Sequence, residues 1–178
     1  NDILIAVADD ADTLKANHWS GSSWGTQTQL AANINGIVAN SNHLFDIAWE
    51  QRPDFDAIIT YGSTSNAIQY RLWDSGTNTW QSAVTLPTAV EAKDWHQLAS
   101  DPNSQNIMLT TVGITDDVDS IEWNGSAWDA AWTSHEASSN DVNWNAWFAY
   151  DDEDENNDPP SIIVNSAAQK TNGSGLVD

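Results

Sequence analysis

The sequence contains no cysteine, one methionine and only five lysine and arginine residues among its 178 positions. Without cysteine, a disulfide framework, a thiolate nucleophile and a cysteine-ligated zinc are all excluded. Five basic residues stand against 26 aspartates and glutamates, a formal net charge of −21, so nucleic acid is excluded as a partner. No run approaches 18 apolar residues, so no membrane insertion is expected.

The composition is that of a folded protein rich in tryptophan. Hydrophobic residues make up 40% of the chain and charged residues only 17%, which indicates a globular protein. Eleven tryptophans are an unusual number, and their amphipathic rings suit both sheet cores and binding surfaces. The sequence begins with Asn1 and not with methionine, which indicates a removed leader or a section of a longer product.

The tryptophans mark an internal repeat. Three turn motifs begin at Trp19, Trp73 and Trp123, and they read WSGSSW, WDSGTNTW and WNGSAW. A β-branched apolar run precedes each motif, and a second short element recurs as Ile47–Glu50, Leu98–Asp101 and Phe148–Asp151. Glycine in each turn supplies the positive φ of a tight hairpin, and the flanking tryptophans are expected to pair across it.

Each repeat therefore reads as four short strands, and almost no helix is expected because no stretch keeps a 3.6-residue apolar period. Repeated four-strand units of about 50 residues predict an all-β fold of β-propeller blades, about three and a half in number. An open stack or a sandwich of meanders is the alternative. The expected domain covers residues 1–150, with units at about 1–44, 45–94 and 95–143, a partial fourth unit at 144–166 and a polar tail at 167–178.

The phase of the repeat is unusual, because the chain starts on the second strand of a unit. Its open edges are templates for another strand. The missing first strand is expected from the C-terminal strand of the same chain, from a neighbouring subunit in a ring or filament, or from a longer gene product.

The turn and strand pattern resembles tandem-repeat propellers of secreted and cell-surface proteins. That resemblance implies fold and location, and it implies no chemistry. The hairpin is also similar to the blades of fucose-binding propeller lectins, in which an arginine and a glutamate before the turn hold the sugar. Here the equivalent apolar strands lack arginine, and only Glu122 supplies a nearby acid. Sialidases, a further propeller family, use three arginines, whereas this chain has only Arg52 and Arg71.

An acidic loop is the candidate calcium site. Asp152, Asp154 and Asn156 fit the alternating oxygen ligands of a calcium loop, with Asp158 nearby. Asn157 stands where glycine is expected, and Pro160 stands where a later acidic ligand would lie. A solvated acidic linker is the alternative interpretation.

Two further kinds of site follow from the residue types. Tryptophans outside the turns can stack on sugar rings, and the candidates are Trp95, Trp132, Trp144 and Trp147. Asn124 and Asn172 begin N-glycosylation sequons, although an ordinary Asn-Gly turn is the favoured interpretation unless the source organism glycosylates its surface proteins.

These observations favour a non-enzymatic protein. We expect a structural or adhesive propeller module, extracellular or on the cell surface of a prokaryote, which self-assembles through its incomplete blades or binds other surface proteins and glycans. The alternative is a carbohydrate-binding lectin, and the second alternative is a glycosidase, which needs two carboxylates in one pocket.

Overall fold

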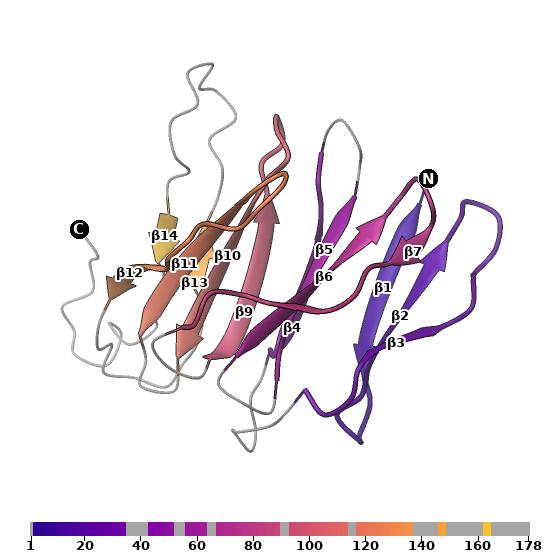
Figure 1. Ribbon diagram of the computed structural model, residues 1–178, viewed down its shortest axis with the longest axis horizontal. Coiled ribbons are helices and arrows are strands. Elements are labelled where there is room, and N and C mark those ends of the chain that lie inside the picture. The colour runs from indigo at the N-terminus through magenta and orange to yellow at the C-terminus, as the bar shows by residue number, and fades with distance from the viewer. Residues whose placement is uncertain are drawn as a thin grey trace.

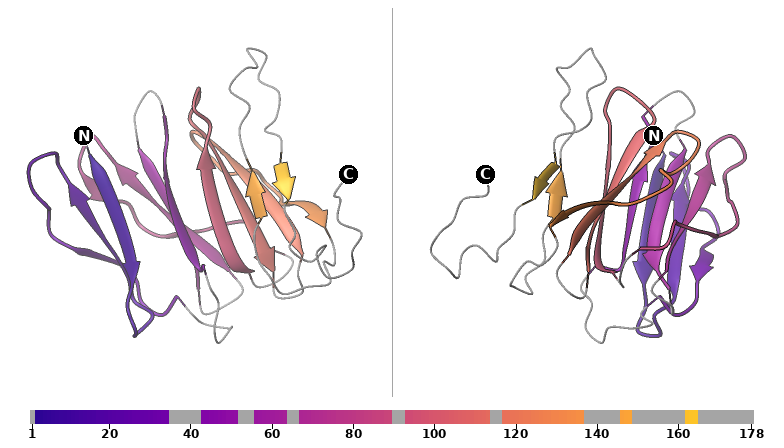
Figure 2. Two further views of the ribbon diagram at one scale, coloured as in Figure 1. Left: turned by 180° about the vertical axis from the view of Figure 1, so that it is seen from behind. Right: turned by 60° about the vertical axis from the view of Figure 1, so that its left-hand side comes forward.

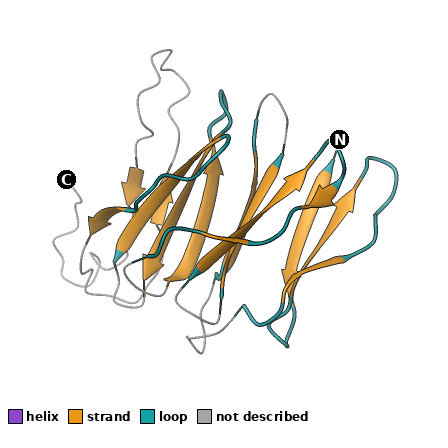
Figure 3. Cartoon of the chain, viewed as in Figure 1, coloured by secondary structure: helices purple, strands orange, loops and turns teal. Residues whose placement is uncertain are grey.

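A computed structural model describes residues 2–34, 43–51, 56–63, 67–89, 93–113, 117–136, 146–148 and 162–164. Within these residues the fold is all-β, with antiparallel strands and no helix (Figure 3). No described helix is long and apolar enough to cross a membrane. The strands form four sheets that stand one behind another in chain order (Figure 1).

We number the sheets 1 to 4. Sheet 1 comprises β1 (Ile3–Ala8), β2 (Leu14–Trp19) and β3 (Thr28–Ala31). Sheet 2 comprises β4 (Phe45–Trp49), β5 (Ala57–Gly62), β6 (Ile68–Asp74), β7 (Thr79–Trp80) and β8 (Val84–Thr85). Sheet 3 comprises β9 (Lys93–Ser100), β10 (Asn106–Gly113), β11 (Val118–Asn124) and β12 (Thr133–Glu136). Sheet 4 pairs β13 (Ala146–Phe148) with β14 (Ile162–Val164).

This arrangement confirms the expected fold class of propeller-like blades. Sheet 3 is a meander in which each strand pairs with its sequence neighbour, and sheet 2 follows the same pattern except that β7 and β8 both pair with β6. Sheet 1 lacks the first strand of that pattern. The start of the outer strand differs between the sheets, although in each of them the second tryptophan of the turn lies opposite the first. In sheets 1 and 3 that tryptophan forms only an isolated bridge to the first, and the outer strand starts later, at Thr28 and Thr133. The outer strand is largely exposed, so less packing holds it in continuous register.

The turns between the paired tryptophans are held by the residue that follows the first one. The Asn124 side-chain oxygen accepts hydrogen bonds from the backbone N–H groups of Ser126 and Ala127. Gly125 has φ 86°, as expected for a tight hairpin. In the longer middle turn the positive φ lies at Asn78 (55°), which tolerates it, and not at the glycine.

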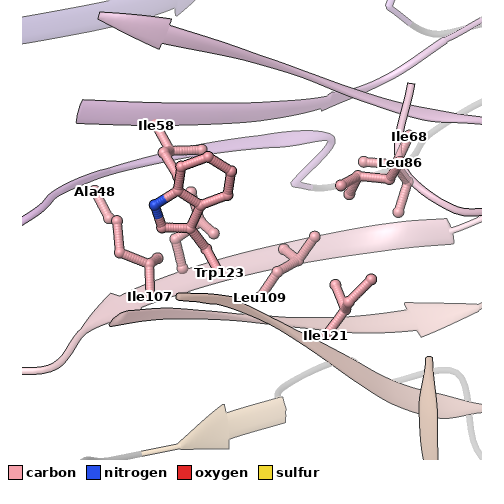
Figure 4. Close-up of a cluster of buried hydrophobic side chains, with 9 residues drawn as sticks. Ala48, Ile58, Ile68, Leu86, Ile107, Leu109, Ile121 and Trp123 are labelled. Carbon is pink, nitrogen blue, oxygen red and sulfur yellow. The ribbon is translucent and has the colours of Figure 1, made fainter. Parts of the chain in front are cut away.

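The core lies between the sheets and not within any one of them. Every residue of β5 from Ala57 to Tyr61 is buried, which explains its continuous apolar run. Ile58 packs with Ile107, Leu109 and Ile121 of sheet 3 (Figure 4). Ile59 belongs to a second cluster, with Leu14, Ala16, Leu30, Ile34 and Tyr61. A middle blade therefore needs a neighbour on each face.

The first strands of sheets 2 and 3 lie side by side and are joined by hydrogen bonds. The Asp46 carboxylate accepts one from the Leu98 backbone N–H at 2.8 Å, and the His43 carbonyl accepts one from the His96 N–H at 2.8 Å. Burial raises the pKa of Asp46, although these backbone donors act against the rise. Bonds between inner strands fix the position of one blade relative to the next.

Candidate functional site

Each tryptophan pair lies on the same face of its own sheet. Trp19, Trp73 and Trp123 are ladder partners of Ile3, Ala57 and Ile107 respectively. Side chains alternate along strands, so these ladders define one face in all three sheets. We call it the back face, because in sheets 2 and 3 it is turned toward the preceding sheet, and we call the opposite one the front face. The two rings of each pair are 5.4–5.8 Å apart between centroids.

In sheet 3 the tryptophan pair closes the interface with sheet 2. The Trp123 indole N–H donates to Glu50, and the Trp128 ring meets Tyr70 edge-on at 5.8 Å. Trp132 adds a hydrogen bond from its indole N–H to the Pro87 carbonyl at 2.8 Å. The motif thus joins one blade to the blade before it.

The pair in sheet 2 plays the same part against sheet 1. The Trp73 ring lies 4.8 Å from that of His18, and the whole back face of β5 is covered. Repetition of this contact supports a structural role for the buried turn tryptophans.

The back face of sheet 1 is apolar at the equivalent positions, but no described residue covers it. Ile3, Ile5 and Val7 are 50%, 47% and 43% exposed, and Trp24 is 49% exposed. The positions equivalent to the first three in sheet 2 are Ala57, Ile59 and Tyr61, and they are 0%, 0% and 1% exposed. This exposed apolar face is the main candidate for a binding surface in the described part of the chain.

A hollow of about 320 Å³ lies on this face. Its lining consists of Ile5, Val7, Lys15, Ala16, Asn17, Trp24 and Gln27. The lysine contacts Asp9 at 2.6 Å, and this bond, with the backbone donors Thr13 and Ala11, lowers the pKa of Asp9 to about 2. The hollow therefore combines an apolar floor, a half-exposed indole and a polar rim.

That combination suits a ligand with both apolar and hydroxylated faces. An indole offers a flat surface for the C–H face of a sugar ring. The Gln27 amide can both donate and accept hydrogen bonds, which hydroxyl groups need, and the Asn17 amide can donate while its oxygen accepts from the His18 backbone N–H at 2.9 Å. The lining of the hollow contains no carboxylate.

Two of the four tryptophans expected to contact sugar can be placed with their side chains. Trp95 is half-buried, stacks on His43 at 4.6 Å and packs with Val112 and Val118. Trp132 lies between sheets 2 and 3, as its bond to Pro87 shows. Trp144 and the side chain of Trp147 lie outside the described residues, although the backbone of the latter pairs with Ile163 in sheet 4.

The remaining candidates fall on turns or outside the described ranges. Asn124 is exposed, as a glycan acceptor must be, but its side-chain oxygen is used in the turn. Asn172 and the calcium candidates Asp152, Asp154, Asn156 and Asp158 are not among the described residues. Within the described residues, no group of three or more histidine and acidic side chains is placed to hold a metal.

Glu122, the acid before the third turn, lies in a cluster of its own. It accepts a hydrogen bond from the Asn106 side chain at 2.9 Å. Burial raises the pKa of Glu122, and the nearby charges of Asp129 and Asp101 add to the rise, while the hydrogen bond from the Asn106 side chain lowers it. A raised pKa is a property of catalytic acids, but burial, with the added repulsion from Asp129 and Asp101, explains it here without a substrate.

Sequence reasoning missed Trp24, because it treated all turn tryptophans as scaffold. The signal that could have identified it was the strand phase. The repeat pattern makes β1 the second strand of its unit, and the first tryptophan pair lies on the back face of that sheet, which no described residue covers.

Comparison with solved structures agrees with this architecture. The chain is similar to the SapL1 lectin, solved in complex with alpha methyl fucoside, with 15% identity and a TM-score of 0.50, covering 83% of this chain and 46% of that one. It is also similar to a triple arginine-to-alanine mutant of AofleA from Arthrobotrys oligospora, with 11% identity and a TM-score of 0.51, covering 85% and 44%. No family model and no curated protein sequence matches. The likeness shows a β-propeller-like fold, and this chain spans less than half the length of either structure.

Proposed function

We propose that this chain is a non-catalytic carbohydrate-binding module, and that the hollow beside Trp24 receives the sugar. The observation that carries the proposal is the half-exposed indole next to two amide side chains on an open apolar face. The fold is one that a lectin bound to alpha methyl fucoside also has, which supports a glycan as the ligand. The lining of the hollow contains no arginine, the residue type expected to hold the sugar in fucose-binding propeller lectins, so the sugar preference is expected to differ.

The polar rim supplies the specificity. Asn17 and Gln27 contribute amide groups to the lining of the hollow, while Lys15 is already paired with Asp9. A neutral or weakly cationic rim favours neutral sugars. We therefore expect neutral hexoses or deoxyhexoses to bind better than acidic sugars, which the net charge of −21 repels.

The experiment is a glycan array followed by calorimetric titration of each hit and of alpha methyl fucoside. Trp24→Ala is expected to reduce affinity at least tenfold, about 1.4 kcal/mol, while Trp24→Phe keeps part of the stacking. Gln27→Ala is expected to weaken binding, and Gln29→Ala, an equally exposed glutamine outside the hollow, serves as its control. No hit on the array, or hits that Trp24→Ala leaves unchanged, would sink this proposal.

A second function is a structural or adhesive one, in which copies of the chain assemble through incomplete blades. The uncovered back face of sheet 1 favours it, because such a face is buried wherever this chain offers a neighbour. Both functions fit a location outside the cell or on a prokaryotic cell surface. Calcium at Asp152, Asp154, Asn156 and Asp158 remains a prediction, and a melting temperature that rises with calcium would support it.

A further inference from the structure

We infer that the back face of sheet 1 is a docking surface for a second copy of this chain, which places the front face of its last sheet there. This inference rests on the second proposed function, self-assembly, and names its surface and its partner. The surface consists of Ile3, Ile5, Val7 and Trp19, with Trp24 at its outer rim.

The first support is the internal repetition of the contact. The same face is present three times in the chain, and in sheets 2 and 3 it is buried against the preceding blade. Ile107 and Leu109 of sheet 3 occupy the positions of Ile3 and Ile5, and both are fully buried. What covers this face in each case is a blade of the same repeat, so the partner with matching chemistry is another such blade.

The second support is the direction of the contact. At both internal interfaces a back face meets a front face, and two back faces never meet among the described sheets. Contact between copies is therefore expected to be head-to-tail. The exposed back face lies at one end of the row of sheets, and sheet 4 lies at the other end, where β13 contacts β9 and β10 (Figure 2).

The third support is the size of the structures that share the fold. The matched part of this chain fills 46% and 44% of the two similar chains. Two copies in a closed ring would therefore provide close to the full set of blades that one of those chains contains. Closure favours a dimer over an open filament, because it leaves no apolar face exposed.

Docking would cover the floor of the hollow, because Ile59 and Tyr61, the equivalents of Ile5 and Val7, are 0% and 1% exposed at the internal interface. At the two closed interfaces the second tryptophan of the turn, Trp80 or Trp128, is only partly buried. Trp24 at the equivalent place would remain partly open at the rim, with the partner blade as the opposite wall. In the assembled form the part of the site left open to a ligand is therefore the rim beside Trp24.

The test is sedimentation of the 178-residue chain over a wide concentration range. Wild type is expected to form a dimer, and Ile5→Lys is expected to raise its dissociation constant at least 100-fold. Val84→Lys is the matched control, because Val84 is 48% exposed on the outer strand of sheet 2 and should leave the dimer unchanged. Near-ultraviolet circular dichroism of each variant separates a lost interface from a lost fold.

Cysteine cross-linking tests the direction of the contact, since the chain contains no cysteine of its own. Chains with Val7→Cys, mixed with chains carrying Ile162→Cys or Ile163→Cys, are expected to form disulfides in at least one mixture. Rapid disulfide formation by Val7→Cys alone would mean that two back faces meet, and would overturn the head-to-tail contact.

The outcomes separate the two levels of the proposal. A chain that is monomeric at high concentration overturns both self-assembly and the docking surface. An oligomer that Ile5→Lys does not weaken keeps self-assembly but overturns this surface. Glycan binding is measured separately through Trp24, so it can stand or fail in either case.

Discussion

The indole N–H of Trp123 donates a hydrogen bond to Oε1 of Glu50 at 2.5 Å, across the interface between sheets 3 and 2. Both side chains are buried, at 3% and 4% exposure, and 73 positions separate them in the chain. A charged acceptor in an apolar interface is stable only while its donors are present. This contact therefore links the repeated tryptophan to the acid that ends the first strand of the preceding blade.

Trp123→Phe should destabilise the protein by about 2–4 kcal/mol, because it removes a charge-assisted hydrogen bond and part of a buried ring. Trp128→Phe is the matched control, since its buried indole N–H has no described hydrogen-bond partner. The measurement is urea unfolding followed by circular dichroism. Equal losses in the two variants would mean that the rings matter and the hydrogen bond does not.

Gly125→Ala should destabilise the third turn. Its φ of 86° is costly for a residue with a side chain, and an added Cβ would lie 2.7 Å from the side-chain oxygen of Gln105. A loss of about 1–2 kcal/mol is expected in thermal or urea unfolding. Gly25→Ala, where the nearest atom lies at an ordinary 3.5 Å, should be close to neutral. A neutral Gly125→Ala would show that the turn relaxes without penalty.

Glu122→Gln should stabilise the protein at neutral pH. Burial and the charges of Asp129 and Asp101 raise the pKa of Glu122, so the folded state binds a proton more readily than the unfolded state does. Stability therefore falls as pH rises from the unfolded pKa through the folded one. The amide keeps an acceptor for Asn106 and removes the charge.

The measurement is the free energy of unfolding of wild type and Glu122→Gln between pH 3.5 and pH 8. The advantage of the variant is expected near pH 7 and should vanish below the ordinary range of a glutamate. Asp10→Asn, at an exposed turn position, controls for the general loss of one negative charge. An equal gain in both variants would assign the effect to net charge.

Most of the fold could be predicted from the residues that recur with the repeat. The apolar runs and turn motifs predicted four-strand units, and the strand phase that they implied matches sheets 1 to 4. Local chemistry decides such features, because a hairpin needs its glycine and its cross-strand pair within a few residues. The late start of the outer strands was not predictable from these motifs, since it depends on exposure in the folded sheet.

The candidate site was predicted less well, for a physical reason. Trp19 and Trp24 flank the same kind of turn as the pairs in sheets 2 and 3, so sequence alone assigns all three pairs one role. Only the missing neighbour distinguishes them, and that is a property of how blades stack. Trp132 shows the converse, because it lies outside any turn motif and yet donates to Pro87 within an interface.

Self-association should strengthen as salt rises. Each copy carries a net charge of −21, so two copies repel one another, while the docking surface formed by Ile3, Ile5 and Val7 is apolar. The screening length falls from about 10 Å at 0.1 M to about 3 Å at 1 M salt, which removes most of the repulsion and leaves the apolar contact. Sedimentation at these two salt concentrations should show a larger dimer fraction at the higher one, and Ile5→Lys should stay monomeric at both. A dimer that salt dissociates would instead be held by ion pairs, and the apolar back face would then not be its interface.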